Sequence, residues 1–205
     1  MPRGTLDTGI RPDYADAMTH ERDDDELMLA FAAGDSSAFD ALYDRYRKPM
    51  YRYLFHAVGN GAVADDLYQD VWSRVIDAQS RFRRGNGFRR WAFTIAHNRL
   101  VDHWRARSRE PNADADDPEA LAGNDADAPD ARTERRQQAD RLRSALMRLP
   151  REQREAFLLK QEAGLTLQEL AEREGVGAET IKSRLRYATG KLKKLLGPRP
   201  EVQGE

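Results

Sequence analysis

Residues 164–196 constrain the fold of this chain most strongly, because two helix patterns stand on either side of a glycine turn. Thr166 followed three residues later by Glu169 is a capping box, which starts a helix. Gly175-Val176-Gly177 then breaks the helical periodicity, and its glycines suit a tight turn. A second helix follows, with apolar side chains spaced to form one buried stripe: Ile181, Leu185, Leu192 and Leu195.

The other face of this second helix is strongly basic. Its polar side chains are Lys182, Ser183, Arg184, Arg186, Tyr187, Lys191, Lys193 and Lys194. Two short helices around a glycine turn, the second one basic, are typical of a DNA-binding helix-turn-helix. The alternative is a surface helical hairpin whose basic face is simply solvated.

Charge is distributed very unevenly along the chain, although the formal net charge is only -1. Residues 81–109 hold nine arginines against the single acid Asp102, a net charge of +8. Residues 110–131 hold eight acidic residues and no lysine or arginine, a net charge of -8. A basic block, which suits nucleic acid, therefore lies beside an acidic block.

The acidic stretch 108–131 is of low complexity and contains three prolines, so it cannot bury a core. We predict a disordered linker that splits the chain into two helical domains and lets them move independently. The chain has no cysteine, which fits a reducing compartment. An apolar run of membrane-spanning length and a signal-peptide pattern are both missing from the sequence, and we expect a cytoplasmic protein.

Helical spacing predicts the remaining elements, and the fold class is therefore all-α. Residues 1–22 lack periodicity and read as a flexible tail. Helices are predicted from Asp23 or Asp24 to Ala33, from Asp35 to Gly59 with Pro49 kinking or dividing it, over 62–78, and from Phe88 to Ala106. In the second domain they run from Ala131 to Arg148 and, after Leu149-Pro150, to Ala163.

The helix over 62–78 has an acidic face that includes Asp66, Gln69 and Asp70. Asp66 and Asp70, one turn apart, could ligate a metal ion, but no histidine or further acid at matching spacing supports this. His97 and His103 are six residues apart and do not share a helix face. We therefore expect no metal and no cofactor, and the face is either solvated or binds a partner.

Arginines alternate with aromatic residues between 81 and 107. Guanidinium groups neutralise phosphates and aromatic rings stack on unpaired bases, so this block suits single-stranded nucleic acid. The alternative is that the aromatic rings, Trp91 and Phe93 among them, are core residues and only the arginines face water.

Taken together, the motifs resemble those of RNA polymerase sigma factors of the extracytoplasmic-function (ECF) group of the sigma-70 family. ALYDRYRKPMYRYL, DDLYQDVWSRV and GFRRWAFTIAHNRLVDHWRARSR resemble the second conserved sigma region. LPREQREAFLLKQEAGLTLQELAEREGVGAETIKSRLRYATGKL resembles the fourth region. The resemblance implies a region 2 domain over 23–107, the acidic linker over 108–131, a region 4 domain over 132–196 and a C-terminal tail over 197–205.

The resemblance also implies roles for particular residues. Docking on the clamp helices of the polymerase's largest subunit falls to Asp66, Leu67, Gln69 and Asp70. A loop over 80–88 captures a flipped base of the minus-10 element, and the minus-10 contacts fall to Arg83, Arg84, Asn86, Phe88, Arg89, Arg90, Trp91, Asn98 and Arg105. Duplex minus-35 DNA is read by Lys182, Ser183, Arg186 and Tyr187.

The implied partners are core RNA polymerase, promoter DNA as duplex and as non-template single strand, and an anti-sigma protein. We do not expect an enzyme, because the sequence shows no nucleophile–base pair, phosphate loop or metal spacing. The principal alternative is a stand-alone helix-turn-helix regulator that binds DNA without polymerase. That class explains residues 164–196 but leaves the arginine–aromatic block without a use.

Overall fold

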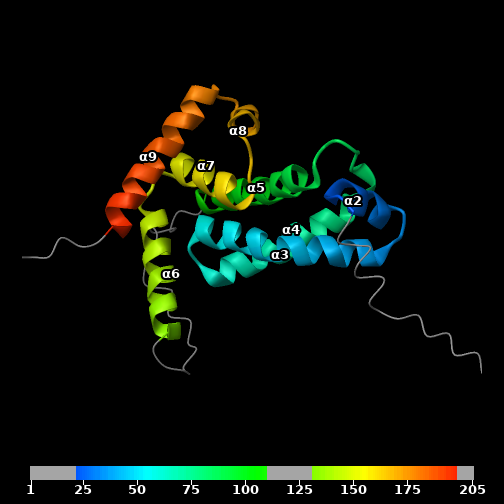
Figure 1. Cartoon of the computed structure of the whole chain (residues 1–205), viewed down its shortest axis with the longest axis horizontal. Coiled ribbons are helices and arrows are strands. Elements are labelled where there is room, and N and C mark those ends of the chain that lie inside the picture. Colours follow the sequence, from blue (N-terminus) through cyan, green and yellow to red (C-terminus); the bar gives the residue numbers. More distant parts are fainter. Residues whose placement is uncertain (1–21, 110–130, 198–205) are drawn as a thin grey trace, which may run out of the picture.

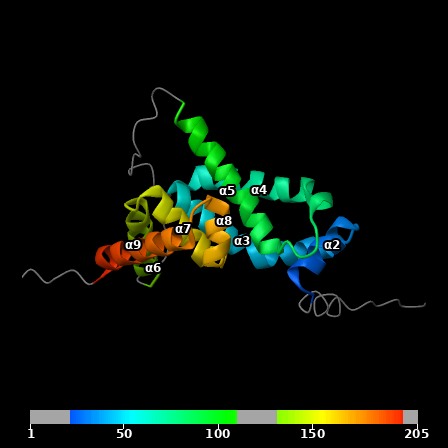
Figure 2. The ribbon, with the colours of Figure 1, turned by 90° about the horizontal axis from the view of Figure 1, so that it is seen from above.

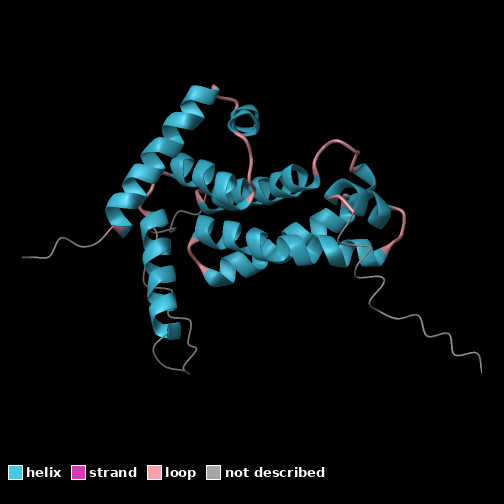
Figure 3. Ribbon diagram, in the orientation of Figure 1, coloured by secondary structure: helices cyan, strands magenta, loops and turns pink. Residues whose placement is uncertain are grey.

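A computed structural model describes residues 22–109 and 131–197 of the chain, with side chains described from residue 137 onward in the second range. The regular elements within these ranges are all helical (Figures 1 and 3). The first range contains α2 (Asp24–Ala32), α3 (Ser36–Val58), α4 (Gly61–Asp77), the short 3-10 helix η1 (Gln79–Arg81) and α5 (Phe88–Arg107). The second contains α6 (Ala131–Met147), α7 (Arg151–Glu162), α8 (Leu167–Glu174) and α9 (Ala178–Leu196). The all-α fold class is thus confirmed.

Side-chain caps set the starts of the first two helices, α2 and α3. Asp23 accepts a hydrogen bond from the Glu26 amide at the start of α2, and Asp35 accepts one from the Ser37 amide at the start of α3. These are the two starts that the sequence predicts. Pro49 does not divide α3, which continues as one helix across it. The loss of one backbone donor there is tolerated in a helix whose buried face runs on both sides of the proline, from Leu42 to Leu54.

Helices α2 to α5 form the first domain around a core of apolar and aromatic side chains. Helix α3 packs against α2, α4 and α5. Trp72 of α4 meets Phe39 and Tyr43 of α3 edge-on, with ring centroids 5.7 and 5.0 Å apart. Phe93 of α5 lies fully buried against Tyr53 of α3, at 5.5 Å. Phe93 is therefore a core residue, one of the two alternatives that its sequence pattern left open.

The second domain ends in the predicted helix-turn-helix. The capping box is present: the Thr166 hydroxyl accepts from the Glu169 amide, and the Glu169 carboxylate accepts from the Thr166 amide. Gly175 closes α8 with a left-handed conformation, φ 64°, which a glycine adopts without strain. Helix α9 then packs its apolar stripe on α7 and α8, and Ile181 and Leu192 are buried there.

The two domains pack directly against each other, and one hydrophobic core extends through both. Helix α7 lies beside α3, as Figures 1 and 2 show. Arg52 of α3 pairs with Glu162 of α7 at 2.8 Å, and the Arg151 guanidinium of α7 lies 3.8 Å from the centroid of the Trp104 ring of α5. The expectation of independently moving domains therefore does not describe this arrangement. Residues 1–21 of the predicted tail and 110–130 of the predicted linker lie outside the described residues.

Candidate nucleic-acid and partner-binding surfaces

The predicted polymerase-binding residues of α4 differ in their exposure and in their contacts within the chain. Asp66 and Gln69 are exposed, whereas Leu67 is only 5% exposed and belongs to the core. Asp70 is half-buried, pairs with Arg74 of its own helix at 3.2 Å and also accepts from Arg99 of α5. Asp66 and Gln69 are thus the two residues of the predicted set that α4 presents freely to a partner.

A groove of about 520 Å³ runs between α4 and α5 and connects two of the predicted surfaces. Asp70 and Ser73 line it from α4, and Asn98, Arg99 and Asp102 line it from α5. Asn98 is exposed in this groove, so its amide is free to bind a polar group from outside. Within the described ranges, no three carboxylates or histidines gather as metal ligands would, and no helix is long and apolar enough to cross a membrane.

The loop between η1 and α5 stands on a small aromatic cluster. Phe82 and Phe88 are 2% and 1% exposed, and the half-buried Trp91 lies 5.3 Å from Phe82 and 6.1 Å from Phe88 between ring centroids. Tyr46 of α3 meets Phe88 edge-on at 5.2 Å. Phe88 therefore does not offer its ring for stacking on a base, contrary to its place in the predicted contact set. The Phe88 ring instead stabilises the loop, because its burial removes apolar surface from water.

The side of this loop that faces away from the aromatic cluster is polar and exposed. The Arg83 guanidinium folds back and donates to the Ser80 and Phe82 carbonyls at 2.9 and 3.0 Å. Arg84 pairs with Glu26 of α2 at 2.9 Å. Asn86 is exposed at the tip, between two glycines with positive φ. Arg83, Arg84 and Asn86 are thus all exposed, and the exposed loop that the sequence predicts here is present.

Asp25 of α2 holds the base of the loop, and sequence reasoning gave it no role. Its carboxylate accepts hydrogen bonds from the Gly85, Gly87 and Phe88 amides. The available signal was indirect: Gly87 precedes α5 and has no side chain to cap it, so a helix starting at Phe88 needs an acceptor from elsewhere. The sequence does not show which acid supplies that acceptor.

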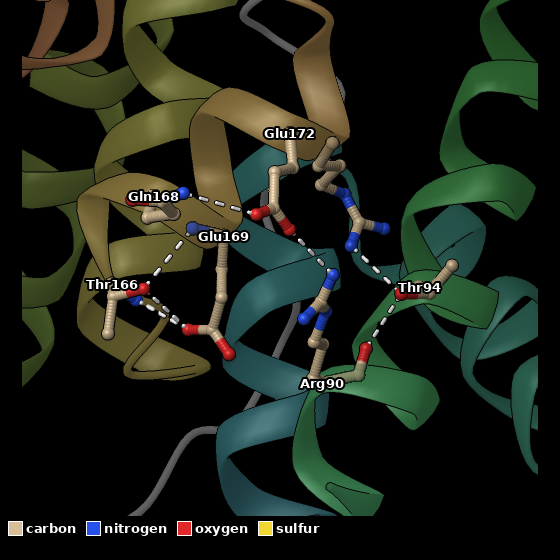
Figure 4. A network of polar contacts seen from close by, with 7 residues as sticks. Arg90, Thr94, Thr166, Gln168, Glu169 and Glu172 are labelled. Atoms are coloured by element: carbon tan, nitrogen blue, oxygen red, sulfur yellow. Dashed lines mark hydrogen bonds and ion pairs between the residues drawn. The ribbon is translucent and has the colours of Figure 1, made fainter. Parts of the chain in front are cut away.

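The first turns of α5 are occupied by contacts inside the chain. The Arg89 side chain donates to the Tyr46 hydroxyl at 3.4 Å. Arg90 pairs with Glu172 of α8 at 3.1 Å, and Figure 4 shows this contact beside the Thr94 hydroxyl. Arg105, in the last turn of α5, is exposed. In this arrangement α8 therefore competes with any nucleic acid for Arg90.

Helix α9 presents most of its predicted reading surface to solvent. Lys182 and Arg186 are exposed one turn apart, and Tyr187 is 59% exposed with the Arg186 guanidinium 5.1 Å from its ring centroid. Ser183 is half-buried between them. Arg184 belongs to the fold, because it pairs with Glu174 of α8 across the turn. The geometry matches a helix whose first half is free to enter a groove of duplex DNA.

Buried polar groups gather where α5 meets α7 and α8. His97 of α5 lies 3.3 Å from the Tyr53 hydroxyl and 3.8 Å from the Glu155 carboxylate. Burial, assisted by Arg173 and Arg151, lowers the pKa of His97 to about 4. The Arg173 guanidinium donates to the Thr94 hydroxyl and to the Phe93 carbonyl at 3.0 and 3.2 Å. The contact between the domains therefore includes a specific polar cluster around a neutral imidazole.

Family models match both domains. The model described as sigma-70 region 2 matches residues 42–110, and the model described as sigma-70, region 4 matches residues 139–192. The chain is 33% identical over 178 residues to the ECF RNA polymerase sigma factor SigM of Mycobacterium tuberculosis, covering 87% of each chain. It is 31% identical over 173 residues to the ECF RNA polymerase sigma factor BldN of Streptomyces coelicolor, covering 83% of this chain and 65% of that one.

Two solved structures share the arrangement of helices. The sigma factor RpoE of Bartonella quintana, in complex with the anti-sigma factor NepR, aligns with a TM-score of 0.63 at 25% identity, covering 77% of this chain and 96% of that one. CnrH, in complex with the cytosolic domain of CnrY, aligns with a TM-score of 0.62 at 24% identity, covering 84% and 96%. The second likeness concerns the fold alone.

Proposed function

Because this chain belongs to the ECF RNA polymerase sigma factors of the sigma-70 family, we propose that it binds core RNA polymerase, recognises promoter DNA and opens it for transcription initiation. The observation that carries the proposal is the order of the two family regions, each with its predicted contact residues largely exposed. The proposed boundaries are those given by the sequence: region 2 over 23–107, a linker over 108–131 and region 4 over 132–196.

The proposed polymerase-binding surface is the exposed face of α4. Asp66 and Gln69 supply the outward polar groups, and Leu67 keeps that turn of the helix in place from beneath. Asp70 orients Arg99 and Arg74 in the same region rather than projecting freely. Polar side chains at the rim of a docking surface select the partner and its orientation more than they add affinity.

The proposed minus-10 surface combines the loop with the outward side of α5. Arg83, Arg84 and Asn86 would contact the non-template strand at the loop, and Asn98 would contact it from the groove beside α4. A base that leaves the duplex must be held by hydrogen bonds to its edge and by stacking. The half-buried Trp91 is the aromatic ring of the predicted set that keeps an accessible face.

The proposed minus-35 surface is the first half of α9. Lys182, Arg186 and Tyr187 project from it, and an arginine that binds guanine with two hydrogen bonds contributes about 1–3 kcal/mol of discrimination. Arg186→Ala should therefore lower initiation at promoters that depend on their upstream element by about 5- to 150-fold. Lys194→Ala, an exposed cation on the same helix, is the matched control and should have little effect.

The packed arrangement of the domains suits regulation by a partner. Glu172 of α8 forms an ion pair with Arg90 of α5, and region 4 packs directly against region 2. We propose that core polymerase separates the domains and that an anti-sigma protein favours their packed state, so that the two compete for the chain. The sigma factor RpoE of Bartonella quintana, which shares this fold, has been solved in complex with the anti-sigma factor NepR.

The proposal also covers what the chain does not do by itself. A sigma factor acts as a subunit that directs the polymerase, so we propose a role without catalytic chemistry of its own. The site of action would be the cytoplasm, where transcription takes place. A stand-alone helix-turn-helix regulator remains the alternative outcome of the test.

The test is transcription in vitro from a library of random promoter sequences, with core RNA polymerase of the organism that encodes the chain. We expect specific transcripts only when the chain and core are both present, and their promoters should share two elements at a fixed spacing. Stable binding of the purified chain to one duplex motif without core, with no effect on core initiation, would instead favour the stand-alone regulator.

A further inference from the structure

We propose that Asp25 of α2 is a positioning residue: its carboxylate holds the loop over 82–88 in the shape that captures a promoter base. The inference rests on the proposed function and extends it, since it gives α2 a part in promoter opening. Sequence reasoning treated α2 only as a short structural helix.

Three backbone amides of the loop converge on this one carboxylate. Oδ2 accepts from the Gly85 amide at 2.8 Å and from the Gly87 amide at 3.3 Å. Oδ1 accepts from the Phe88 amide at 2.6 Å. Both oxygens are therefore used, and the bonds are charge-assisted, which makes them shorter and stronger than bonds between neutral groups.

The loop needs such an acceptor because α5 begins without a cap of its own. Gly87, the residue before the helix, has no side chain to accept from the first free amides. A carboxylate at this position also interacts favourably with the positive end of the helix dipole. Asp25 thus acts as an N-cap that comes from another helix, about 60 residues earlier in the chain.

The conformation held by Asp25 decides which side chains reach outward. Gly85 and Gly87 have φ of 89° and 70°, a region open to glycine, and they turn the chain sharply on either side of Asn86. Phe82 and Phe88 anchor the two ends of the loop in the core. Asn86 is left exposed at the tip, where it can meet a base.

Helix α2 is itself firmly attached, so it can serve as the fixed point. Asp24, next to Asp25, pairs with Arg45 of α3 at 2.7 Å and accepts from the Tyr46 hydroxyl. Glu26, on the other side, pairs with Arg84 of the loop at 2.9 Å. Three consecutive acids therefore connect α3, α2 and the loop.

A loop held in advance captures a base at lower entropic cost than a loop that must order on contact. Removing the carboxylate should leave the fold intact, because the Gly85 and Gly87 amides are exposed and can bind water instead. The loop would then be mobile, so promoter opening should slow and discrimination between bases at the captured position should weaken.

The experiment compares Asp25→Ala and Asp25→Asn with Asp23→Asn in the full chain with core polymerase. Asp25→Asn keeps the shape but places an amide against the loop N–H groups. Asp23→Asn removes a charge from the same helix and keeps its N-cap, since asparagine and aspartate cap equally well. The measurements are core affinity, initiation on duplex and on pre-melted promoters, base preference at the captured position, and amide exchange of Gly85, Gly87 and Phe88 in the isolated protein.

We expect both Asp25 variants to bind core normally. Asp25→Ala should open duplex promoters about five- to tenfold more slowly, with weaker base preference and near-normal activity on pre-melted DNA. Asp25→Asn keeps one of the two accepting oxygens and should show the same changes to a smaller extent. Amide exchange in the loop should speed up only in these two variants. Opening rates and base preference equal to those of Asp23→Asn would overturn the proposal. If the wild type initiates at no promoter, the proposed function fails, and unchanged loop exchange in Asp25→Ala would overturn the anchoring role separately.

Discussion

Acidification should weaken the packing of the two domains through His97. This side chain is 14% exposed at the contact of α5 with α7, and burial, with Arg173 and Arg151, lowers its pKa to about 4 from an ordinary 6.5. When the domains separate, the imidazole meets water and its pKa returns towards 6.5. The separated state then binds the proton more readily, so the packed state loses stability as pH falls from 6.5 towards 4.

The size of the effect follows from those two values. Above pH 7 the imidazole is almost entirely neutral in both the packed and the separated state. His97 then contributes almost no pH dependence to the equilibrium between the two states. At pH 5.5 the separated state gains about 1.4 kcal/mol, a factor of about ten in the equilibrium constant. Burial raises the pKa values of Glu155 and Glu174, whose protonation in acid favours the packed state and opposes this change. His97→Gln, which does not titrate, therefore isolates the histidine contribution.

The chain has no cysteine, so dyes can be attached at Asp40→Cys on α3 and Lys194→Cys on α9, both exposed positions. Energy transfer between them, followed through a urea titration, reports the separation of the domains. From pH 7.5 to 5.5 the urea midpoint of the His97 protein should fall by about 0.5–1.4 M relative to that of His97→Gln, given the usual urea dependence. Equal pH dependence of the two midpoints would refute the assignment of this histidine.

Two further predictions concern the polymerase surface and the fold. Asp66→Arg should weaken core binding in a competition assay without loss of thermal stability, because this carboxylate is exposed. Asp40→Arg, on the exposed side of α3, is the control. Equal core affinities of the two variants would show that α4 is not part of the interface. Gly59→Ala should lower stability by about 1–3 kcal/mol in thermal unfolding, because φ is 71° and the new Cβ would lie 2.9 Å from the Met147 sulfur. Gly34 also has a positive φ, 102°, but an added Cβ would meet no atom within 4 Å, so Gly34→Ala should lower stability less. Equal losses of stability in the two variants would mean that backbone strain, and not the contact with Met147, sets the cost.

Local sequence rules determined the secondary structure of the described residues almost completely. Asp23, Asp35 and the Thr166–Glu169 box start their helices where predicted, and Gly175 ends α8. The spacing of apolar residues also gave the buried face of α9. These features depend on neighbours within one or two turns, which is why a sequence read alone contains them.

The candidate surfaces could be predicted only in part. The exposed positions of Asp66, Gln69, Lys182 and Arg186 follow from helical periodicity, because they lie opposite apolar stripes. Burial of Phe88 does not follow, since an aromatic residue beside arginines suits a core and a stacking surface equally well. Its environment is set by Tyr46, more than 40 residues earlier in the chain.

Only the tertiary structure decided which groups meet over long separations in the chain. Asp25 reaches the loop amides, and Arg90 pairs with Glu172, through contacts between residues 60 to 82 positions apart in the chain. The linker composition indicated freedom between the domains, whereas the apolar faces of α3 and α7 pack together and bury His97 with them. Local propensity determines where helices begin and which face is apolar; which apolar face covers which depends on shape and burial summed over the whole chain.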